Sequence, residues 1–164
     1  MKINQTKKTY RCKTTYNEKV VDDAVADFVF NSLRSDVKWV QGVPSKKGPT
    51  RLARPLQIGD NDLVDQLMNQ AIKELGQYNY RLDGIYLNYY QDGKMWTPNH
   101  SHPGTHQIVI SLGCERVLNV AKKEFKMKNG SAIIFGSATH GVPKCDVTEG
   151  RISIASFLTP IGNK

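Results

Sequence analysis

The spacing of apolar residues changes along this chain, and this change limits the folds that it can adopt. Up to about residue 82, apolar side chains recur at helical intervals over residues 18–34 and 63–75. Beyond it they alternate in short runs separated by turn residues, which is typical of strands. We expect strands at residues 85–90, 106–113, 116–121, 124–128, 131–136 and 151–158. Two helices followed by short, turn-linked strands indicate an α+β chain that is mainly β, with a double-sheet jelly roll or barrel as its body.

The expected helices have recognisable starts. Asn17 is the expected N-cap of the first helix, and Phe28 belongs to the apolar stripe that this helix would bury. The second helix has the more regular stripe, and Asn61 or Asp62 is expected to cap it. Residues 42–61 are rich in Gly, Pro and basic side chains, so we expect a long loop there that holds at most short strands.

Length and cysteine content set the class of protein. At 164 residues the chain can bury a hydrophobic core without stabilisation by disulfide bonds or metal ions. We interpret residues 16–164 as one domain, preceded by a basic arm at residues 1–15. The three cysteines are far apart and form no CxxC pair, so neither a disulfide framework nor a zinc ribbon is indicated. No stretch matches a signal peptide or a membrane span. We expect a cytoplasmic monomer without membrane contact, in the host cytoplasm if the chain is viral.

The chain is basic, with a net charge of +8. Such a surface favours polyanions, namely nucleic acid, an anionic membrane face or acidic small molecules. Part of the charge is clustered at the N-terminus and in the segment that holds Lys46, Lys47, Arg51 and Arg54. We therefore expect a nucleic acid or nucleotide as partner, the alternative being a solvated basic surface that binds nothing.

Three of the four histidines lie within the segment PNHSHPGTHQ. His100 and His102 are two residues apart, so at a strand end they face the same side and can bind one metal ion. His140 can complete the set from a separate segment. The two-histidine, one-carboxylate set of non-haem iron oxygenases has an acid where His102 stands. The alternative is that these are polar residues at strand ends, and His106, which begins the next strand, is not expected to be a ligand.

Two polar clusters are expected to face inward by the same alternation. Asn88 and Tyr90 share one face of their strand, and Arg151 and Ser153 share one face of the last strand. An arginine in an isoleucine-rich strand is costly to bury unless an anion meets it, and a cosubstrate carboxylate would do so. The alternatives are a surface arginine paired across the sheet, an asparagine that bonds backbone groups and a core tyrosine.

Taken in order, these segments resemble the AlkB-like 2-oxoglutarate- and iron-dependent dioxygenases over about residues 16–160. RLARPLQIGDN is similar to that family's substrate-lid strand, and LNYYQDG to its Asn-x-Tyr-x-x-Gly element. HSH stands in place of His-x-Asp, ISLG is similar to the strand that follows, HGVP to the distal histidine and RIS to an Arg-x-Asn/Ser tail. No single piece is specific, so their order and spacing carry the resemblance. It implies a double-stranded β-helix with the N-terminal helices packed on one sheet.

The resemblance also implies roles for individual residues. Fe(II) would be held by His100, His102 and His140, and 2-oxoglutarate by Asn88, Tyr90, Arg151 and Ser153, with O2 as the other cosubstrate. Substrate contacts are expected from Arg51 and Arg54 in the lid segment, and from Trp96, which could stack on a base near the pocket mouth.

The chain departs from that family's pattern in two places. His102 replaces the usual Asp, so the positive charge of the metal is left uncompensated. A site made of three histidines also suits Zn²⁺. Phe157 stands where the family has a second arginine, six residues after Arg151. These departures bear on the preferred metal and on selectivity for 2-oxoglutarate.

The expected function is that of an Fe(II)- and 2-oxoglutarate-dependent dioxygenase that hydroxylates or oxidatively demethylates a nucleobase in DNA or RNA, as in DNA repair. One alternative is a zinc-bound or catalytically inactive nucleic-acid-binding module on the same fold. Another is a dioxygenase that acts on a protein or a small molecule.

Overall fold

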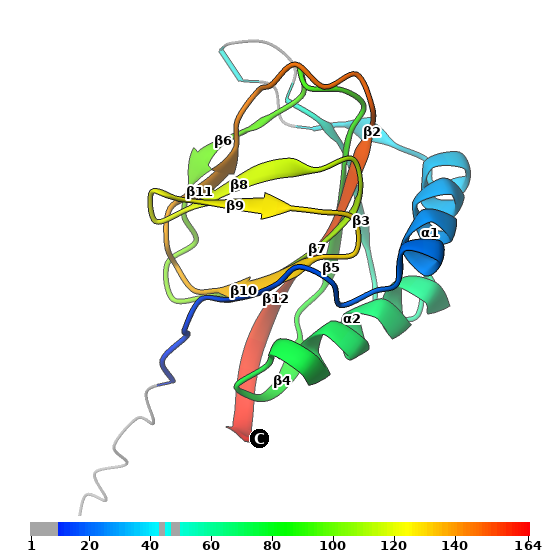
Figure 1. The fold of residues 1–164 in the computed structure, drawn as a ribbon. Coiled ribbons are helices and arrows are strands. Elements are labelled where there is room, and N and C mark those ends of the chain that lie inside the picture. Colours follow the sequence, from blue (N-terminus) through cyan, green and yellow to red (C-terminus); the bar gives the residue numbers. More distant parts are fainter. Residues whose placement is uncertain (1–9, 43–44, 47–49) are drawn as a thin grey trace, which may run out of the picture.

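The computed structural model describes residues 10–42, 45–46 and 50–164, which form two helices and two antiparallel sheets (Figure 1). The helices are α1 (Asp23–Asp36) and α2 (Asp62–Leu75). The strands are β1 (Thr15–Asn17), β2 (Val40–Gln41), β3 (Leu52–Leu56), β4 (Tyr78–Leu82), β5 (Ile85–Tyr90), β6 (Thr97–His100), β7 (His106–Gly113), β8 (Arg116–Val120), β9 (Lys123–Met127), β10 (Ala132–Phe135), β11 (His140–Val142) and β12 (Arg151–Asn163). Most of the expected basic arm, and Lys47, lie outside the described residues.

The strands form two layers. The larger sheet has eight strands in the order β1-β10-β7-β12-β5-β3-β2, with β4 paired to β12, and the smaller has four in the order β6-β11-β8-β9. Every pairing is antiparallel. Figure 1 shows the smaller sheet on one side of the larger one and both helices on its other side. This is the double-sheet jelly roll, with helices packed on one sheet, that the sequence predicted.

Two apolar cores hold the layers together. The core between the helices and the larger sheet includes Val29, Leu33, Met68, Ala71, Leu87, Ile110, Ile152 and Ile154. The core between the sheets consists of Tyr90, Leu118, Val120, Met127, Ile133, Phe135 and Val142. Burial of a large apolar side chain contributes roughly 1.5–3 kcal/mol to folding. Because side chains alternate along a strand, one face of β5, β7 and β12 fills the helix core and the other is left to line the space between the sheets.

The first helix differs from the prediction. Its N-cap is Asp22, whose side chain makes no capping bond, and Asn17 instead accepts a hydrogen bond from the backbone N–H of Lys19. Phe28 was expected to be buried and is 64% exposed. The reason is that α1 turns a neighbouring stripe toward the sheet, formed by Ala26, Val29 and Leu33.

The second helix and the predicted strands are confirmed. Oδ1 of Asn61 accepts the backbone N–H of Val64 at 3.1 Å, as an N-cap does. All six predicted strands are present, although β12 continues to Asn163. Six further strands, β1 to β4, β6 and β11, were not assigned from the sequence, because each is short or lacks clear alternation. Neither helix of the described chain combines the length and apolarity needed to cross a membrane.

Candidate functional site

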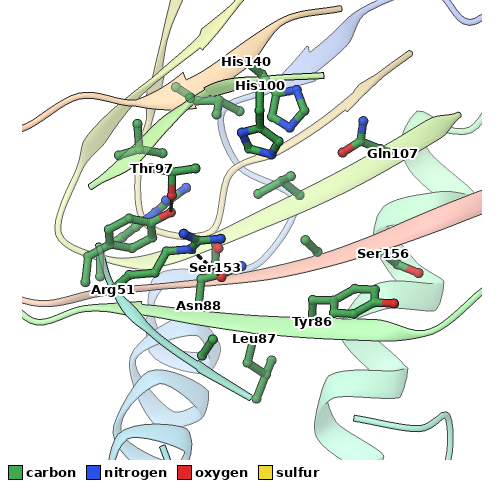
Figure 2. A pocket seen from close by; sticks show the side chains of 18 of the residues that line it. Arg51, Tyr86, Leu87, Asn88, Thr97, His100, Gln107, His140, Ser153 and Ser156 are labelled. Carbon is green, nitrogen blue, oxygen red and sulfur yellow. Dashed lines mark hydrogen bonds between the residues drawn. The ribbon is translucent and has the colours of Figure 1, made fainter. Parts of the chain in front are cut away.

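The structure brings the three predicted metal ligands together. His100 ends β6 and His140 begins β11, and their Cα atoms are direct partners in the smaller sheet. His102 follows two residues after β6, and the ligand nitrogens of all three side chains lie within 4.8 Å of one another. The ring centroids of His100 and His140 are 4.3 Å apart, and Figure 2 shows the two rings side by side above the cavity. Three imidazoles at this separation can bind one transition-metal ion.

The hydrogen bonds of the histidines leave metal-binding nitrogens available. Nδ1 of His100 lies 2.8 Å from the carbonyl of Pro98, and Nδ1 of His140 lies 2.9 Å from that of Ala138. A carbonyl only accepts, so each Nδ1 carries the proton and each Nε2 keeps its lone pair for a metal. Burial lowers the pKa of His140 to about 4. The pKa of His102 is also lowered, mainly by burial and to a lesser extent by the charge of His100. Neutral imidazoles at physiological pH fit a metal site of this kind.

A cavity of about 490 Å³ lies beside the three histidines and between the two sheets. This volume falls in the range of small-molecule sites. Among the described residues, its lining contains no Asp or Glu, and its basic residues are His100, His102, His140, Arg51, Arg54 and Arg151. A cavity with this balance favours ligands that carry negative charge.

Arg151 lies in the wall of this cavity and is only 1% exposed. Its Nε donates to Oγ of Ser111 at 2.8 Å, and its guanidinium carbon lies 5.2 Å from the ring centroid of Tyr90. Its Nη2 has no hydrogen-bond partner among the described residues, and no carboxylate of these residues pairs with it. Burial lowers the pKa of Arg151 to about 10, so it remains a cation at neutral pH. A buried guanidinium with an unpartnered donor is suited to an anionic ligand.

The other residues assigned to the cosubstrate lie beside Arg151. Asn88 and Ser153 are direct partners across β5 and β12, and both border the cavity. The hydroxyl oxygens of Tyr90 and Thr97 are 2.6 Å apart in a hydrogen bond, and Oδ1 of Asn88 accepts from Nε of Arg51 at 2.8 Å (Figure 2). Sequence reasoning did not single out Thr97. No sequence signal identifies it, because strand alternation would place Thr97 and His100, three residues apart, on opposite faces.

The two lid arginines are not equivalent. Both border the cavity, but Arg54 is exposed and Arg51 is half-buried. In the register of β3 and β5, Arg54 is the partner of Leu87, which belongs to the helix core, whereas Ala53 is the partner of Asn88. Alternation therefore places Arg51 on the face of Asn88 and turns Arg54 toward the opposite face.

Trp96 does not line the histidine cavity, contrary to the expectation for its position. Thr97 points into that cavity, so the preceding side chain turns the other way. Trp96 instead lines a second cavity of about 400 Å³, where Nζ of Lys144 lies 5.2 Å from its ring centroid. His106 is not part of the group formed by the other three histidines, and its Nδ1 lies 3.1 Å from the hydroxyl of Tyr80.

A second buried arginine, Arg116, was missed by the sequence reasoning. Its Nη1 donates to the carbonyl of Asp92 at 3.1 Å, and its Nη2 donates to the carbonyls of Met95 and Pro143 at 2.8 and 2.9 Å. It thereby ties the loop before β6 to the loop after β11, the two strands that carry His100 and His140. Nothing in the sequence separates it from a surface arginine, because its partners are backbone carbonyls from distant segments.

Comparison with known proteins found no family model and no curated protein that matches this chain. Solved structures do match. The non-heme alpha ketoglutarate dependent epimerase SnoN from nogalamycin biosynthesis is 12% identical with a TM-score of 0.75, covering 92% of this chain and 77% of that one. A Pseudomonas putida prolyl-4-hydroxylase is 15% identical with a TM-score of 0.63, covering 91% and 93%. HygX from Streptomyces hygroscopicus, solved with nickel and 2-oxoglutarate bound, is 10% identical with a TM-score of 0.66, covering 90% and 82%.

These similarities establish the fold. The fold is shared with the three proteins over 92%, 91% and 90% of this chain. At so low an identity the chemistry has to be argued from the residues of this chain.

Proposed function

We propose that this chain is an Fe(II)- and 2-oxoglutarate-dependent oxygenase whose metal is held by His100, His102 and His140. The observation that carries the proposal is the convergence of these imidazoles at a cavity whose wall holds the buried, carboxylate-free Arg151. The structural neighbours support it, because HygX was solved with nickel and 2-oxoglutarate and SnoN with Fe³⁺ and alpha ketoglutarate.

Each residue of the site has a role in this proposal. The bound iron would supply the activation of O2 by which 2-oxoglutarate and the substrate are oxidised together. Arg151 donates to the distal carboxylate of the cosubstrate, a charge-assisted interaction that is strong in a buried site. Tyr90, Asn88 and Ser153 offer hydroxyl and amide groups on the same wall. The Nδ1–carbonyl bonds of the histidines fix the direction in which Nε2 points.

For the substrate, the proposal is a nucleobase in DNA or RNA that is hydroxylated or oxidatively demethylated by an AlkB-like enzyme. The net charge of +8 supports a polyanionic partner. The base would have to be single-stranded or extruded from its stack to reach the histidines.

Two observations favour other candidates. An all-histidine site without an acid suits zinc, which would make the chain a zinc-bound nucleic-acid-binding module without turnover. The named neighbours include a prolyl-4-hydroxylase and an epimerase from nogalamycin biosynthesis, which favours an oxygenase that acts on a protein or a small molecule.

The test begins with the purified protein loaded with Fe(II) without oxygen. The expected result is a visible charge-transfer absorption on addition of 2-oxoglutarate, followed by O2-dependent succinate release that rises with a single-stranded oligonucleotide carrying N-methylated bases. A His140→Ala variant, which lacks one ligand, is the control. Zinc in the protein as isolated, with oligonucleotide binding and no succinate, would support the zinc alternative. Succinate release indifferent to nucleic acid would remove the nucleobase substrate and leave the oxygenase.

A further inference from the structure

A second guanidinium, that of Arg51, borders the histidine cavity. It comes from the segment that leads into β3, which pairs with β5, the neighbour of β12. Arg51 immediately precedes β3, and its Nε donates to Oδ1 of Asn88 at 2.8 Å, while its Nη1 lies 3.4 Å from Oγ1 of Thr50. Figure 2 shows Arg51 reaching across the cavity toward Asn88 and Ser153. Among the described residues no acidic side chain forms an ion pair with it.

The strand register places Arg51 close to Arg151. Leu52 is the partner of Tyr89, so Arg51 lies at the level of Tyr90, which is itself the partner of Arg151. The three side chains therefore follow one another across three neighbouring strands on the same face. Strands are spaced by about 4.8 Å, so the Cα atoms of the two arginines are about 10 Å apart, a gap that two long side chains can close around one ligand.

This row lies at the end of the cavity away from His102. Phe157 is six residues beyond Arg151 along β12, about 20 Å by the rise of a strand, and its ring centroid is 5.0 Å from that of His102. An apolar ring therefore stands beside the three histidines, and the long side chains of Arg51 and Arg151 border the same cavity from the other end of β12. A 2-oxo acid held to the metal by its keto-acid end would direct its distal carboxylate toward the arginines.

We propose that Arg51 is a specificity-determining residue that binds the distal carboxylate of 2-oxoglutarate together with Arg151. The inference rests on the proposed function, and it reassigns Arg51 from the substrate to the cosubstrate. It accounts for the bond to Asn88, because Oδ1 is taken by Arg51 and the amide donors of Asn88 remain for the ligand. It also explains how the chain retains two cations for a dianion although Phe157 stands in place of a second arginine on β12.

The test measures ligand binding rather than turnover. Protein loaded with Fe(II) under anaerobic conditions is titrated in a calorimeter with 2-oxoglutarate and with 2-oxobutyrate, which lacks the distal carboxylate. Arg51→Gln is expected to weaken 2-oxoglutarate binding by about 10- to 100-fold, the range for one charged hydrogen bond, and to leave 2-oxobutyrate binding unchanged. Arg51→Lys is expected to recover part of the loss, because it keeps the charge but not the fork of donors.

Two controls make the outcome decisive. Arg34→Gln removes the same charge from α1, on the other side of the larger sheet, and is expected to change neither titration. Thermal unfolding of each variant shows whether the fold is kept. If Arg51→Gln binds 2-oxoglutarate as wild type does, or weakens both ligands equally, the assignment of Arg51 is wrong and the proposed function stands. If metal-loaded wild type does not bind 2-oxoglutarate, both are overturned.

Discussion

Replacing Arg151 by Met is expected to change stability and ligand binding in different directions. Burial lowers the pKa of Arg151 from 12.5 to about 10, so keeping it charged costs the ligand-free protein about 3 kcal/mol. Arg151→Met removes this cost. It also removes the bond to Ser111, about 1 kcal/mol, whereas the favourable effect of Tyr90 is already contained in the lowered pKa. The free energy of unfolding should therefore stay the same or rise by up to about 2 kcal/mol.

The same replacement should weaken the binding of 2-oxoglutarate. A guanidinium that donates to a carboxylate contributes about 1.5–3 kcal/mol for each charged hydrogen bond. For the metal-loaded protein, Arg151→Met should weaken 2-oxoglutarate binding by about 100-fold or more, measured by anaerobic calorimetry. Urea unfolding of the ligand-free protein, followed by circular dichroism, gives the stability.

Arg116 provides a matched control because the two arginines are alike in burial and surroundings. Arg116 is 2% exposed, and its guanidinium carbon also lies 5.2 Å from the Tyr90 ring centroid. It differs in donating to three backbone carbonyls. Arg116→Met would leave these acceptors unpaired and should destabilise the protein by about 3–5 kcal/mol. A loss of that size from Arg151→Met, with 2-oxoglutarate binding unchanged, would show that Arg151 is structural and refute the reasoning.

Three further predictions concern the metal ligands and the backbone. His102→Asp should shift metal retention from Zn²⁺ toward Fe(II) after loading from an equimolar mixture, because a carboxylate supplies the oxygen ligand of the iron triad; an unchanged metal ratio by elemental analysis would contradict this. In the metal-free protein the pKa of His140 is lowered to about 4 from 6.5, so the unfolded chain binds more protons between these pH values. The free energy of unfolding should hold above pH 6.5 and fall by up to about 3 kcal/mol by pH 4, and urea titrations of His140→Gln should lack this component. Gly130 has φ 81°, and a Cβ there would meet the carbonyl oxygen of Val21 at 2.2 Å. Gly130→Ala should therefore lower the free energy of unfolding by about 2 kcal/mol or more. The loss should exceed that of Gly59→Ala, where φ is 96° but nothing lies within 4 Å of the added Cβ. Equal urea midpoints for the two variants would count against the clash.

The parts of the site that follow from alternation were predictable from the sequence. Leu87 is buried in the helix core while Asn88 and Tyr90 border the cavity, as the period of two in β5 requires. The same holds for Arg151 and Ser153 in β12. Once a strand is recognised, the faces of its residues follow without knowledge of the partner strands.

Contacts that depend on pairing between distant segments could not be predicted in this way. The place of His140 opposite His100 depends on β11 pairing with β6, and both strands are too short to show a period. The sequence offered His140 as a third ligand from a separate segment, and the family resemblance implied the same role, but neither gave its partner strand. The bond from Arg51 to Asn88 depends on β3 pairing with β5 across a segment that contains all of α2. The proline and basic residues of β3 hide it among loop-like residues.

The first helix shows a different limit. Phe28 and Val29 are neighbours on one helix, about 100° apart around its axis, and each belongs to a stripe with helical spacing. Apolarity alone favours the stripe of Phe28. The structure buries that of Val29, together with the small Ala26, and leaves Phe28 64% exposed. Packing against the larger sheet decides between the two stripes, and the sheet is built from strands that come later in the chain.

The positive charge of the cavity links the proposed metal site to the proposed carboxylate site. A histidine at position 102 supplies no negative charge to a divalent metal, and Arg151 adds a cation that no carboxylate of the described residues balances. In a buried site, positive charges that lack partners raise the energy of the ligand-free protein. A dianionic keto acid would offset both at once, because its keto-acid end meets the metal and its distal carboxylate meets the arginines. His102→Asp and Arg151→Met therefore reduce the same excess of positive charge from its two ends, and each should weaken the attraction of the cavity for dianions.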